Sequence, residues 1–394
     1  MRTLLIMLCL TACATVHAQE TFLLKKEMLQ ETRRKITRKD PATLKALAWL
    51  VKECDTLLTR GPYSVTYKSK VPPSGDKHDY MSVGPYWWPD SSKADGLPYI
   101  RKDGQINPER YTIRDADFQS SLNREVYTLA IGWYFTGKEA YARHAAKLLR
   151  TWYIDTATRM NPNLNYGQAI PGITDGRGIG LIDTRNADKL IDGMQLLKNS
   201  GALPKADYKA IQQWFNQYLT WMRTSPVGLD EADEKNNHGT WYDVQAVAIA
   251  LFTEQKDSAR LWLEQQTKAR IESQLKQDGS QPHELARTLS WNYSQMNLKA
   301  FFELALLAEN VNVDLWQYKT ASGKTIEKAF SWLLPFAEGK QTWQHQQIKH
   351  MDTDGYLELA VMAKRKYPQL DLAPLYQKHN NYYNPMLQLV GWTY

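Results

Sequence analysis

Asn236-Asn237-His238-Gly239-Thr240-Trp241-Tyr242 is the stretch that decides the fold, because it opens a long apolar run with helical spacing. The run includes Val244, Val247, Ile249 and Ala250, and neither proline nor glycine interrupts it. Apolar residues that recur at three-to-four spacing are typical of a helix. The stretch therefore predicts a helix over about 240–252.

Polar residues mark the point at which this helix begins. Asn237 and His238 fall just before the apolar residues, at or beside the helix N-terminus. Free backbone N–H groups and the helix dipole favour an anion at this position. Two interpretations stay open here. The pair binds an anionic ligand, or Asn237 is simply an N-cap and His238 a polar surface residue.

The same spacing recurs along most of the chain, while strand signals are few. Helices are predicted at about 41–57, 120–136, 139–153, 186–198, 206–222, 240–252, 258–275, 291–309, 324–337 and 355–366. Asp40-Pro41 is typical of an N-cap followed by proline at the first helical position. Short connections favour antiparallel neighbours. We therefore expect an all-α fold, an incomplete (α/α) toroid of helical hairpins formed by one domain over 19–394.

Two long loops rich in glycine, proline and aromatic residues separate some of these helices, at about 62–118 and 161–183. Long loops are uncommon in a compact domain unless they have a function, so we expect them to lie over the cleft at the open end of the toroid. Arg177 on the second loop is a candidate to bind a carboxylate. The candidates on the first loop to stack against sugar rings are Tyr80, Tyr86, Trp87 and Trp88. Each of these side chains could instead be buried against the toroid rim.

A second group of candidate residues lies about fifty residues after the opening stretch. Tyr293 belongs to an apolar helical stripe, and Arg287 precedes it by six residues. Six residues of regular helix turn through about 600°, which places the two on different faces. They can converge only if Arg287 lies on the loop before the helix. Otherwise Arg287 forms a surface ion pair, with Glu284 for example, and His283 is an alternative imidazole.

The first residues of the chain have the pattern of a secretory signal peptide, with an apolar run and a small-x-small site before Gln19. We expect residues 1–18 to be removed and the protein to be periplasmic. Leu10-Thr11-Ala12-Cys13 also matches a lipoprotein box, so lipidation of Cys13 and anchoring to the outer membrane are the alternative. Cys54 is then the one cysteine of the mature chain, which excludes an intramolecular disulfide framework.

The formal net charge of +7 fits a polyanionic partner for an exported protein. The sequence has no dense run of basic residues and no nucleic-acid-binding motif, so nucleic acid is excluded as a partner. No transmembrane segment is expected. Asp352-Thr353-Asp354-Gly355 begins like a calcium loop but lacks the glutamate at its twelfth position. We expect neither a metal nor a cofactor.

Taken together, these segments resemble the helical-toroid alginate lyases, a family of polysaccharide lyases with an incomplete (α/α) barrel. The resemblance covers roughly residues 60–310 and is closest to a divergent branch that includes lyases of alginate and glucuronan. The segments that carry it are Tyr80-Met81-Ser82-Val83-Gly84-Pro85-Tyr86-Trp87-Trp88-Pro89, Gly176-Arg177-Gly178-Ile179-Gly180-Leu181-Ile182-Asp183-Thr184, Asn236-Asn237-His238-Gly239 and Arg287 with Tyr293. Gly239 after the histidine, and the residues that follow it, depart from the best-known alginate enzymes.

The resemblance implies β-elimination on a 1,4-linked polyuronate, with mannuronate-rich alginate as the expected substrate and glucuronan as the alternative. It assigns Asn237, His238 and Arg287 to the uronate carboxylate and Tyr293 to proton transfer. His238 would be the base for guluronate. We also expect Tyr242 to contact the substrate. A tyrosine that acts as a base needs its pKa of about 10 lowered, and the positive charge of a neighbouring arginine lowers the pKa of a phenol.

Two other classes of function compete with a lyase. A glycoside hydrolase would need two carboxylates beside the scissile bond, for which Asp175, Asp183 and Asp243 are available. A helical glycan-binding lipoprotein of the outer membrane would also explain Cys13 and the aromatic loops. The products separate a lyase from a hydrolase, because only a lyase creates a double bond that absorbs in the near ultraviolet.

Overall fold

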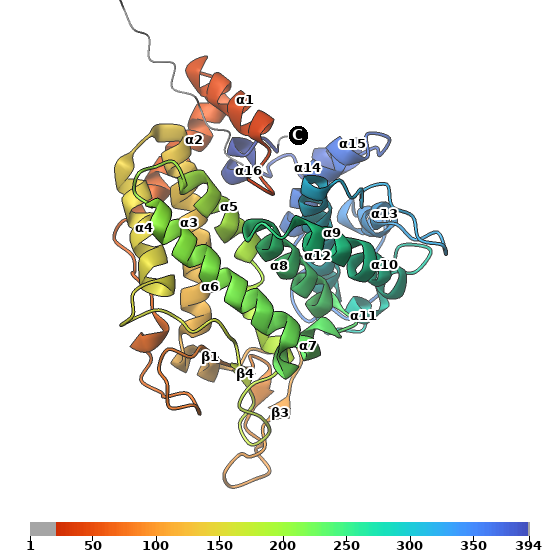
Figure 1. Cartoon of the computed structure of the whole chain (residues 1–394). Coiled ribbons are helices and arrows are strands. Elements are labelled where there is room, and N and C mark those ends of the chain that lie inside the picture. Colours follow the sequence, from red (N-terminus) through yellow and green to blue (C-terminus); the bar gives the residue numbers. More distant parts are fainter. Residues whose placement is uncertain (1–20, 393–394) are drawn as a thin grey trace, which may run out of the picture.

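The computed structural model describes residues 21–392 as a body of helices with a few short strands (Figure 1). The predicted signal peptide and Cys13 lie outside these residues. Within them, none of the helices combines the length and apolar character needed to cross a bilayer. The expectation of an all-α protein is confirmed.

The inner helices of the molecule are buried on most of their faces. They are α3 (Asp115–Thr136), α5 (Ala187–Leu197), α8 (Asn237–Phe252), α12 (Ser290–Ala308) and α14 (Asp354–Lys366). In α8, every residue except His238 is buried. A helix that is apolar all round has to lie in the interior, which explains why α8 packs against α5, α7, α9 and α12 at once.

Each inner helix follows an outer helix that packs against the ring. The outer helices are α2 (Pro41–Leu57), α4 (Glu139–Tyr153), α6 (Lys205–Thr224), α9 (Lys256–Trp262) with α10 (Lys268–Gln274), and α13 (Ile326–Ala337). The stretch Leu263–Thr267 between α9 and α10 is π-helical. Asp40 caps α2 as predicted, since its side chain accepts from the Thr43 amide at 2.8 Å.

The remaining helices are shorter or lie near the ends of the chain. They are α1 (Lys26–Thr37), α7 (Pro226–Ala232), α11 (Pro282–Leu285), α15 (Ala373–Lys378) and α16 (Pro385–Leu389). Helix α16 packs on α2. The first described segment is held by Asp192 of α5, whose carboxylate accepts from the amides of Phe22, Leu23 and Leu24.

The two long loops are joined to each other, which their sequences did not predict. Strand β1 (Met81–Val83) of the first loop pairs in parallel with β4 (Tyr166–Ala169) of the second. Within the first loop, β2 (Trp87–Trp88) pairs antiparallel with β3 (Ile100–Arg101). Gly180 is required where the second loop packs against the end of this pairing, since a Cβ on Gly180 would lie 2.5 Å from the backbone of Gly167.

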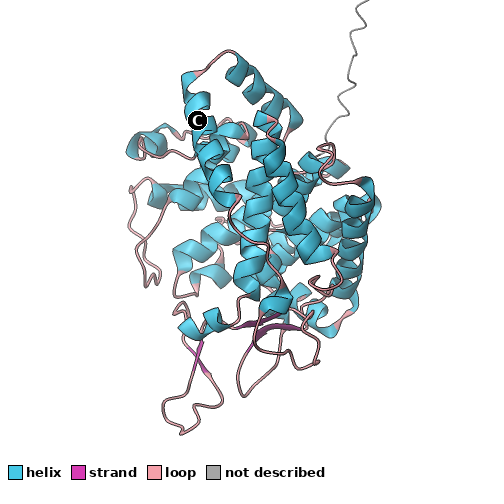
Figure 2. Cartoon of the chain, turned by 90° about the vertical axis from the view of Figure 1, so that its left-hand side faces the viewer, coloured by secondary structure: helices cyan, strands magenta, loops and turns pink. Residues whose placement is uncertain are grey.

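The loops and the first turns of α8 and α12 lie at the same end of the molecule. Figure 2 shows the strands and long loops gathered below the helical body, and Figure 1 places α7, α11 and β3 there as well. This arrangement confirms the expected loops over one end of the helical ring. It brings residues from the two loops, from α7 and from α11 to the N-terminal turns of the inner helices.

Candidate active site

Asn236, and not Asn237, is the N-cap of α8: its side chain accepts from the His238 amide at 2.9 Å. Asn237 is therefore free of the capping role and is completely buried. Its backbone amide and its Nδ2 both donate to Glu284 of α11, at 2.7 and 2.8 Å. Burial raises the pKa of Glu284 to about 7, although the two bonds from Asn237 act in the opposite direction.

His238 is held by a second buried carboxylate. Its Nδ1 lies 2.9 Å from Glu231 Oε1, and Glu231 belongs to α7. Burial alone would lower the pKa of His238, but the charge of Glu231 raises it above the usual value. Nε2 carries none of the hydrogen bonds found within residues 21–392 and is the ring atom left for a ligand.

Gly239 is required by the packing of the turn that carries His238. A Cβ at this position would lie 2.1 Å from Arg270 Nη1 and 2.2 Å from the Glu234 carbonyl. Arg270 donates to Asp243 and to the carbonyls of Ala232 and Glu234, so it fixes the segment between α7 and α8. Glycine at position 239 therefore has a local steric reason.

Arg287 and Tyr293 converge in the way that the sequence required. Arg287 lies between the end of α11 and the start of α12, outside any regular helix. Its guanidinium carbon is 3.8 Å from the centroid of the Tyr293 ring, which is the distance of a cation–π contact. The predicted position of Arg287 on the connection before the helix is confirmed.

The partner of Arg287 is Asp103, which the sequence analysis did not consider. Arg287 Nη2 donates to Asp103 Oδ1 at 2.7 Å, and Nε lies 3.1 Å from Oδ2. Thr288 donates to Oδ2 from both its amide and its hydroxyl. Burial would raise the pKa of Asp103, but the bonds from Arg287 and Thr288 hold it well below its usual range.

The Tyr293 hydroxyl shares a hydrogen bond of 2.8 Å with the hydroxyl of Tyr86. Both rings line a cavity of about 280 Å³, together with Leu289, Asn292, Met296, Lys349 and His350. Burial raises the pKa of Tyr293 well above its usual value, and Tyr86 adds to this, while Arg287 lowers it only in part. Arg287 thus lowers the pKa of Tyr293, as expected, but the effects of burial and Tyr86 outweigh it.

Three further loop residues are half-buried beside this cluster. Arg177 donates to the carbonyl and side-chain oxygen of Gln168, and its guanidinium lies 5.8 Å from the Trp87 ring centroid. The indole N–H of Trp88 donates to the Gln105 carbonyl at 3.0 Å. Trp87, Trp88 and Arg177 therefore remain candidates to line a cleft, although each is already in contact with the loops.

Tyr80 and Tyr242 are corrections to the predicted substrate contacts, because both are completely buried. The Tyr80 hydroxyl donates to Asp183 at 2.9 Å, which ties the two long loops together. The Tyr242 hydroxyl donates to the Met222 carbonyl at 2.9 Å, inside the contact between α6 and α8. Neither ring presents a face to a sugar, so both side chains are structural.

Sequence reasoning missed the three acids that hold the predicted residues. Glu231 and Glu284 are almost fully buried and contact His238 and Asn237, respectively. Glu284 was considered only as a surface partner of Arg287, and His283 proves to be exposed. An acidic residue next to apolar residues is on its own a weak indication of a buried, functional carboxylate, because the residue that it binds lies elsewhere in the chain. Among the residues described, no cluster of three or more His, Cys, Asp or Glu could hold a metal ion.

Comparisons with known proteins agree on one family. The family model described as alginate lyase matches residues 64–343. An alginate lyase from Bacteroides ovatus is 37% identical, with a TM-score of 0.87, and the match covers 95% of this chain and 99% of that one. None of the curated proteins searched gives a significant match.

More distant structures share the fold. Alginate lyase A1-III from Sphingomonas species A1 is 17% identical with a TM-score of 0.58, covering 87% of this chain and 88% of that one. A variant of A1-III complexed with tetrasaccharide is 18% identical with a TM-score of 0.56, covering 82% of this chain and 87% of that one.

Proposed function

Since the chain belongs to the alginate lyase family of polysaccharide lyases, we propose that it cleaves mannuronate-rich alginate by β-elimination through Asn237, His238, Arg287 and Tyr293. The observation that carries the proposal is the contact of 3.8 Å between the Arg287 guanidinium and the ring of Tyr293, a residue that lines a cavity. It places a fixed positive charge beside a phenol that can exchange a proton with a ligand.

In the proposed reaction, the carboxylate of the reacting sugar binds among Asn237, His238 and Arg287. Asn237 Nδ2 donates one hydrogen to Glu284 and has a second hydrogen to offer. His238 offers Nε2, and the raised pKa favours its protonated form. Donors fixed in advance around the carboxylate stabilise the charge that develops when C5 is deprotonated, and one such donor is typically worth about 10²–10³ in rate.

Tyr293 is the proposed proton carrier. Its phenolate takes the proton from C5, the electrons of the broken C–H bond form the C4–C5 double bond, and the C4–O4 bond breaks. The phenol then returns the proton to O4, so the phenolate is regenerated. One group can do both on β-D-mannuronate, because the C5 proton and O4 lie on the same side of the ring. The substrate must also separate Tyr293 from Tyr86, since that bond favours the neutral phenol.

Glu231 and Glu284 are proposed positioning residues. Both are buried. Glu284 accepts a hydrogen bond from Asn237, and Glu231 pairs with His238. A carboxylate that already fixes a ring nitrogen or an amide restricts its orientation before substrate arrives. This reduces the reorganisation needed in the transition state.

Glucuronan is the alternative substrate with the same mechanism, because glucuronate differs from mannuronate only at C2. A hydrolytic mechanism has less support from the geometry. Asp243 accepts from Trp262, Thr267 and Arg270 inside the protein. Asp183 is likewise engaged by Tyr80, Ser82 and Gln168. Neither is free to act as an acid or a nucleophile.

The test is the growth of ultraviolet absorbance on polymannuronate, polyguluronate and glucuronan, with wild type and Tyr293→Phe in parallel. We expect absorbance to rise on polymannuronate and to be lost in the variant. If absorbance rises on glucuronan alone, glucuronan replaces mannuronate-rich alginate as the proposed substrate, and the proposed mechanism stays the same. Tight polymer binding without any absorbance would favour the glycan-binding alternative. Export through residues 1–18, with or without lipidation of Cys13, stays a proposal that mass spectrometry of the mature protein would test.

A further inference from the structure

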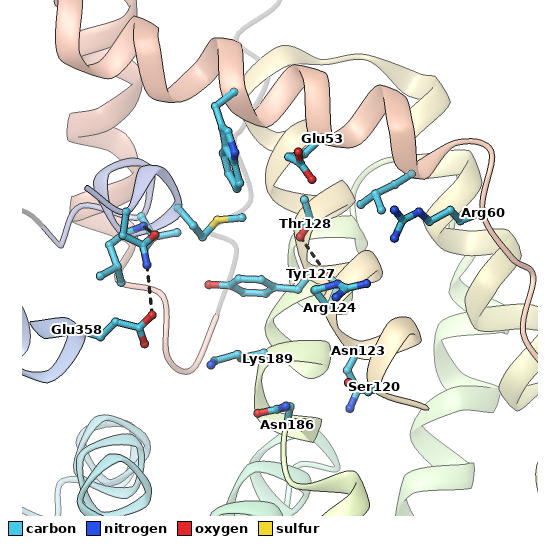
Figure 3. A pocket seen from close by; sticks show the side chains of 16 residues that line it. Glu53, Arg60, Ser120, Asn123, Arg124, Tyr127, Thr128, Asn186, Lys189 and Glu358 are labelled. Carbon is cyan, nitrogen blue, oxygen red and sulfur yellow. Dashed lines mark hydrogen bonds between the residues drawn. The ribbon is translucent and has the colours of Figure 1, made fainter. Parts of the chain in front are cut away.

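Three cavities adjoin one another, and the first of them contains the proposed catalytic tyrosine. The cavity of about 280 Å³ that contains Tyr293 shares the lining residues Asn292 and Met296 with a cavity of about 410 Å³. That middle cavity shares Asn186 and Lys189 with a third, of about 610 Å³ (Figure 3). The three cavities therefore form a series that begins at Tyr293 and ends beside α2 and α16.

The middle cavity is lined by three cationic side chains, Arg185, Lys189 and Lys299, and by one carboxylate, Asp352. Two of the cations already have acidic partners, since Lys299 lies 2.9 Å from Glu358 and Lys189 lies 3.5 Å from Glu303. Arg185 has no ion pair within residues 21–392. The one hydrogen bond that its side chain makes there goes from Nη1 to the Ile182 carbonyl at 3.2 Å.

Helix α5 directs its N-terminus towards the same cavity, because its N-cap Asn186 and the adjacent Arg185 both line it. The Asn186 side chain caps no backbone amide. In this eleven-residue helix the Lys189 amide donates to Asp188, and the amides of Ala187 and Asp188 at its start add positive potential. Arg185 and the helix therefore act on an anion in the same direction.

Trp241 is an independent indication that a ligand belongs in this cavity. It lines the cavity from α8, yet only 2% of its surface is exposed. Its indole N–H is buried and has no hydrogen-bond partner among residues 21–392. A buried donor without a partner is costly, so such a group is expected to bond to a molecule that occupies the cavity.

We propose that the middle cavity is a second carboxylate subsite, in which Arg185 and Trp241 bind a uronate residue of the polymer that does not itself react. The proposal rests on the proposed function. It concerns substrate length, because only a chain that extends beyond the reacting sugars reaches Arg185. Trp241 supplies a neutral donor, which suits a carboxylate or ring hydroxyl oxygen.

The third cavity is less suited to an anion. Arg60 and Arg124 line it, but both lie within 3.8 Å of Glu125, and the acids Glu53 and Glu358 line it as well. Figure 3 shows Lys189 and Asn186 on its lower side and Glu358 across from them. Positive and negative side chains therefore offset each other in the third cavity, and the middle cavity is the better site for a carboxylate.

The experiment compares wild type, Arg185→Gln and Trp241→Phe on a ladder of saturated oligomers from disaccharide to octasaccharide of the polyuronate that the enzyme cleaves. We expect kcat/KM for the long oligomers to fall about tenfold or more through KM, as for the loss of a hydrogen bond to a charged group. For the shortest cleaved oligomer, kcat/KM should change less than about twofold. Arg143→Gln is the matched control, since Arg143 is an exposed arginine of α4 outside these cavities.

An equal loss at every length, or no loss at any length, would overturn the subsite. If Trp241→Phe lowers the thermal midpoint, the half-exposed Arg185→Gln carries the test alone. If wild type cleaves no polyuronate, the proposed function fails separately. The subsite is then decided by calorimetry of octasaccharide binding, where about tenfold weaker binding by Arg185→Gln supports it and equal binding refutes it.

Discussion

Asp103 and Arg287 form an ion pair across 184 residues of sequence, with Nη2 2.7 Å from Oδ1. Asp103 follows strand β3 in the first long loop, whereas Arg287 precedes α12. The pair therefore fastens the loop to the segment that carries the candidate catalytic tyrosine. It also places a negative charge next to the guanidinium that is proposed to receive the substrate's carboxylate.

Asp103→Asn should move the alkaline rise of the pH–rate profile to lower pH. The charge of Asp103 contributes to the raised pKa of Tyr293, and Arg287 acts in the opposite direction. Removing the carboxylate leaves the guanidinium uncompensated, so the phenolate forms at lower pH, by about one pH unit. Profiles of kcat/KM between about pH 5 and 10 test this. Asp95→Asn, on an exposed part of the same loop, is the control, and an unchanged Asp103→Asn profile would contradict the prediction.

Tyr86→Phe should separate the roles of the two bonded tyrosines. Tyr293→Phe removes the proposed proton carrier and is expected to lower kcat by about 10²–10⁴. Tyr86→Phe keeps the ring and removes a bond that favours the neutral form of Tyr293. We expect kcat to stay within about tenfold of wild type, with the alkaline rise beginning at lower pH. Should both variants be equally inactive in the absorbance assay, Tyr293 is not the single proton carrier.

Glu284→Gln should remove an acidic limb from the pH–rate profile. The pKa of Glu284 is raised to about 7, so the carboxylate that accepts both bonds from Asn237 is lost as pH falls through 7. A protonated carboxyl offers a donor where an acceptor is needed, and Asn237 loses its fixed orientation. Wild type should lose kcat below about pH 7, whereas Glu284→Gln should have a lower rate without this limb. The exposed Glu264→Gln should keep the wild-type profile, and a limb that persists in Glu284→Gln assigns it to another group.

Tyr80→Phe should affect stability and not catalysis. Its hydroxyl donates to the Asp183 carboxylate at 2.9 Å in a fully buried position. Loss of a bond to a charged group is expected to lower the free energy of unfolding by about 1.5–3 kcal/mol. Urea unfolding measures this, and kcat should stay within about twofold of wild type. Tyr67→Phe, at a position 53% exposed, should change neither quantity. A large loss of kcat with unchanged stability would restore Tyr80 as a substrate contact.

Most of the helices could be predicted because their signals are local. The observed bounds of α2 (Pro41–Leu57) and α4 (Glu139–Tyr153) equal the predicted 41–57 and 139–153. Apolar spacing, caps and prolines act over a few residues and need no knowledge of the rest of the chain. The short helices α7 and α11 were missed, because one or two turns do not establish a period.

The candidate site was predicted in its residue types but not in its contacts. Asn237, Arg287 and Tyr293 stand in motifs, and the position of Arg287 outside the helix followed from helical geometry. Tyr80 was assigned to the wrong role, because an aromatic residue on a loop has the same appearance in sequence whether it is exposed or buried. The bond to Asp183 depends on a parallel pairing of β1 with β4, which joins two loops about 85 residues apart.

The sequence by itself determined the helices, the two long loops and the identity of the proposed catalytic groups. Tertiary structure alone decided which acids hold those groups, Asp103 on Arg287, Glu231 on His238 and Glu284 on Asn237. The physical reason is that a buried carboxylate is stable only where donors from other elements reach it. Those donors lie as far as 184 residues away, and only the packing of the inner helices and the loops brings them together.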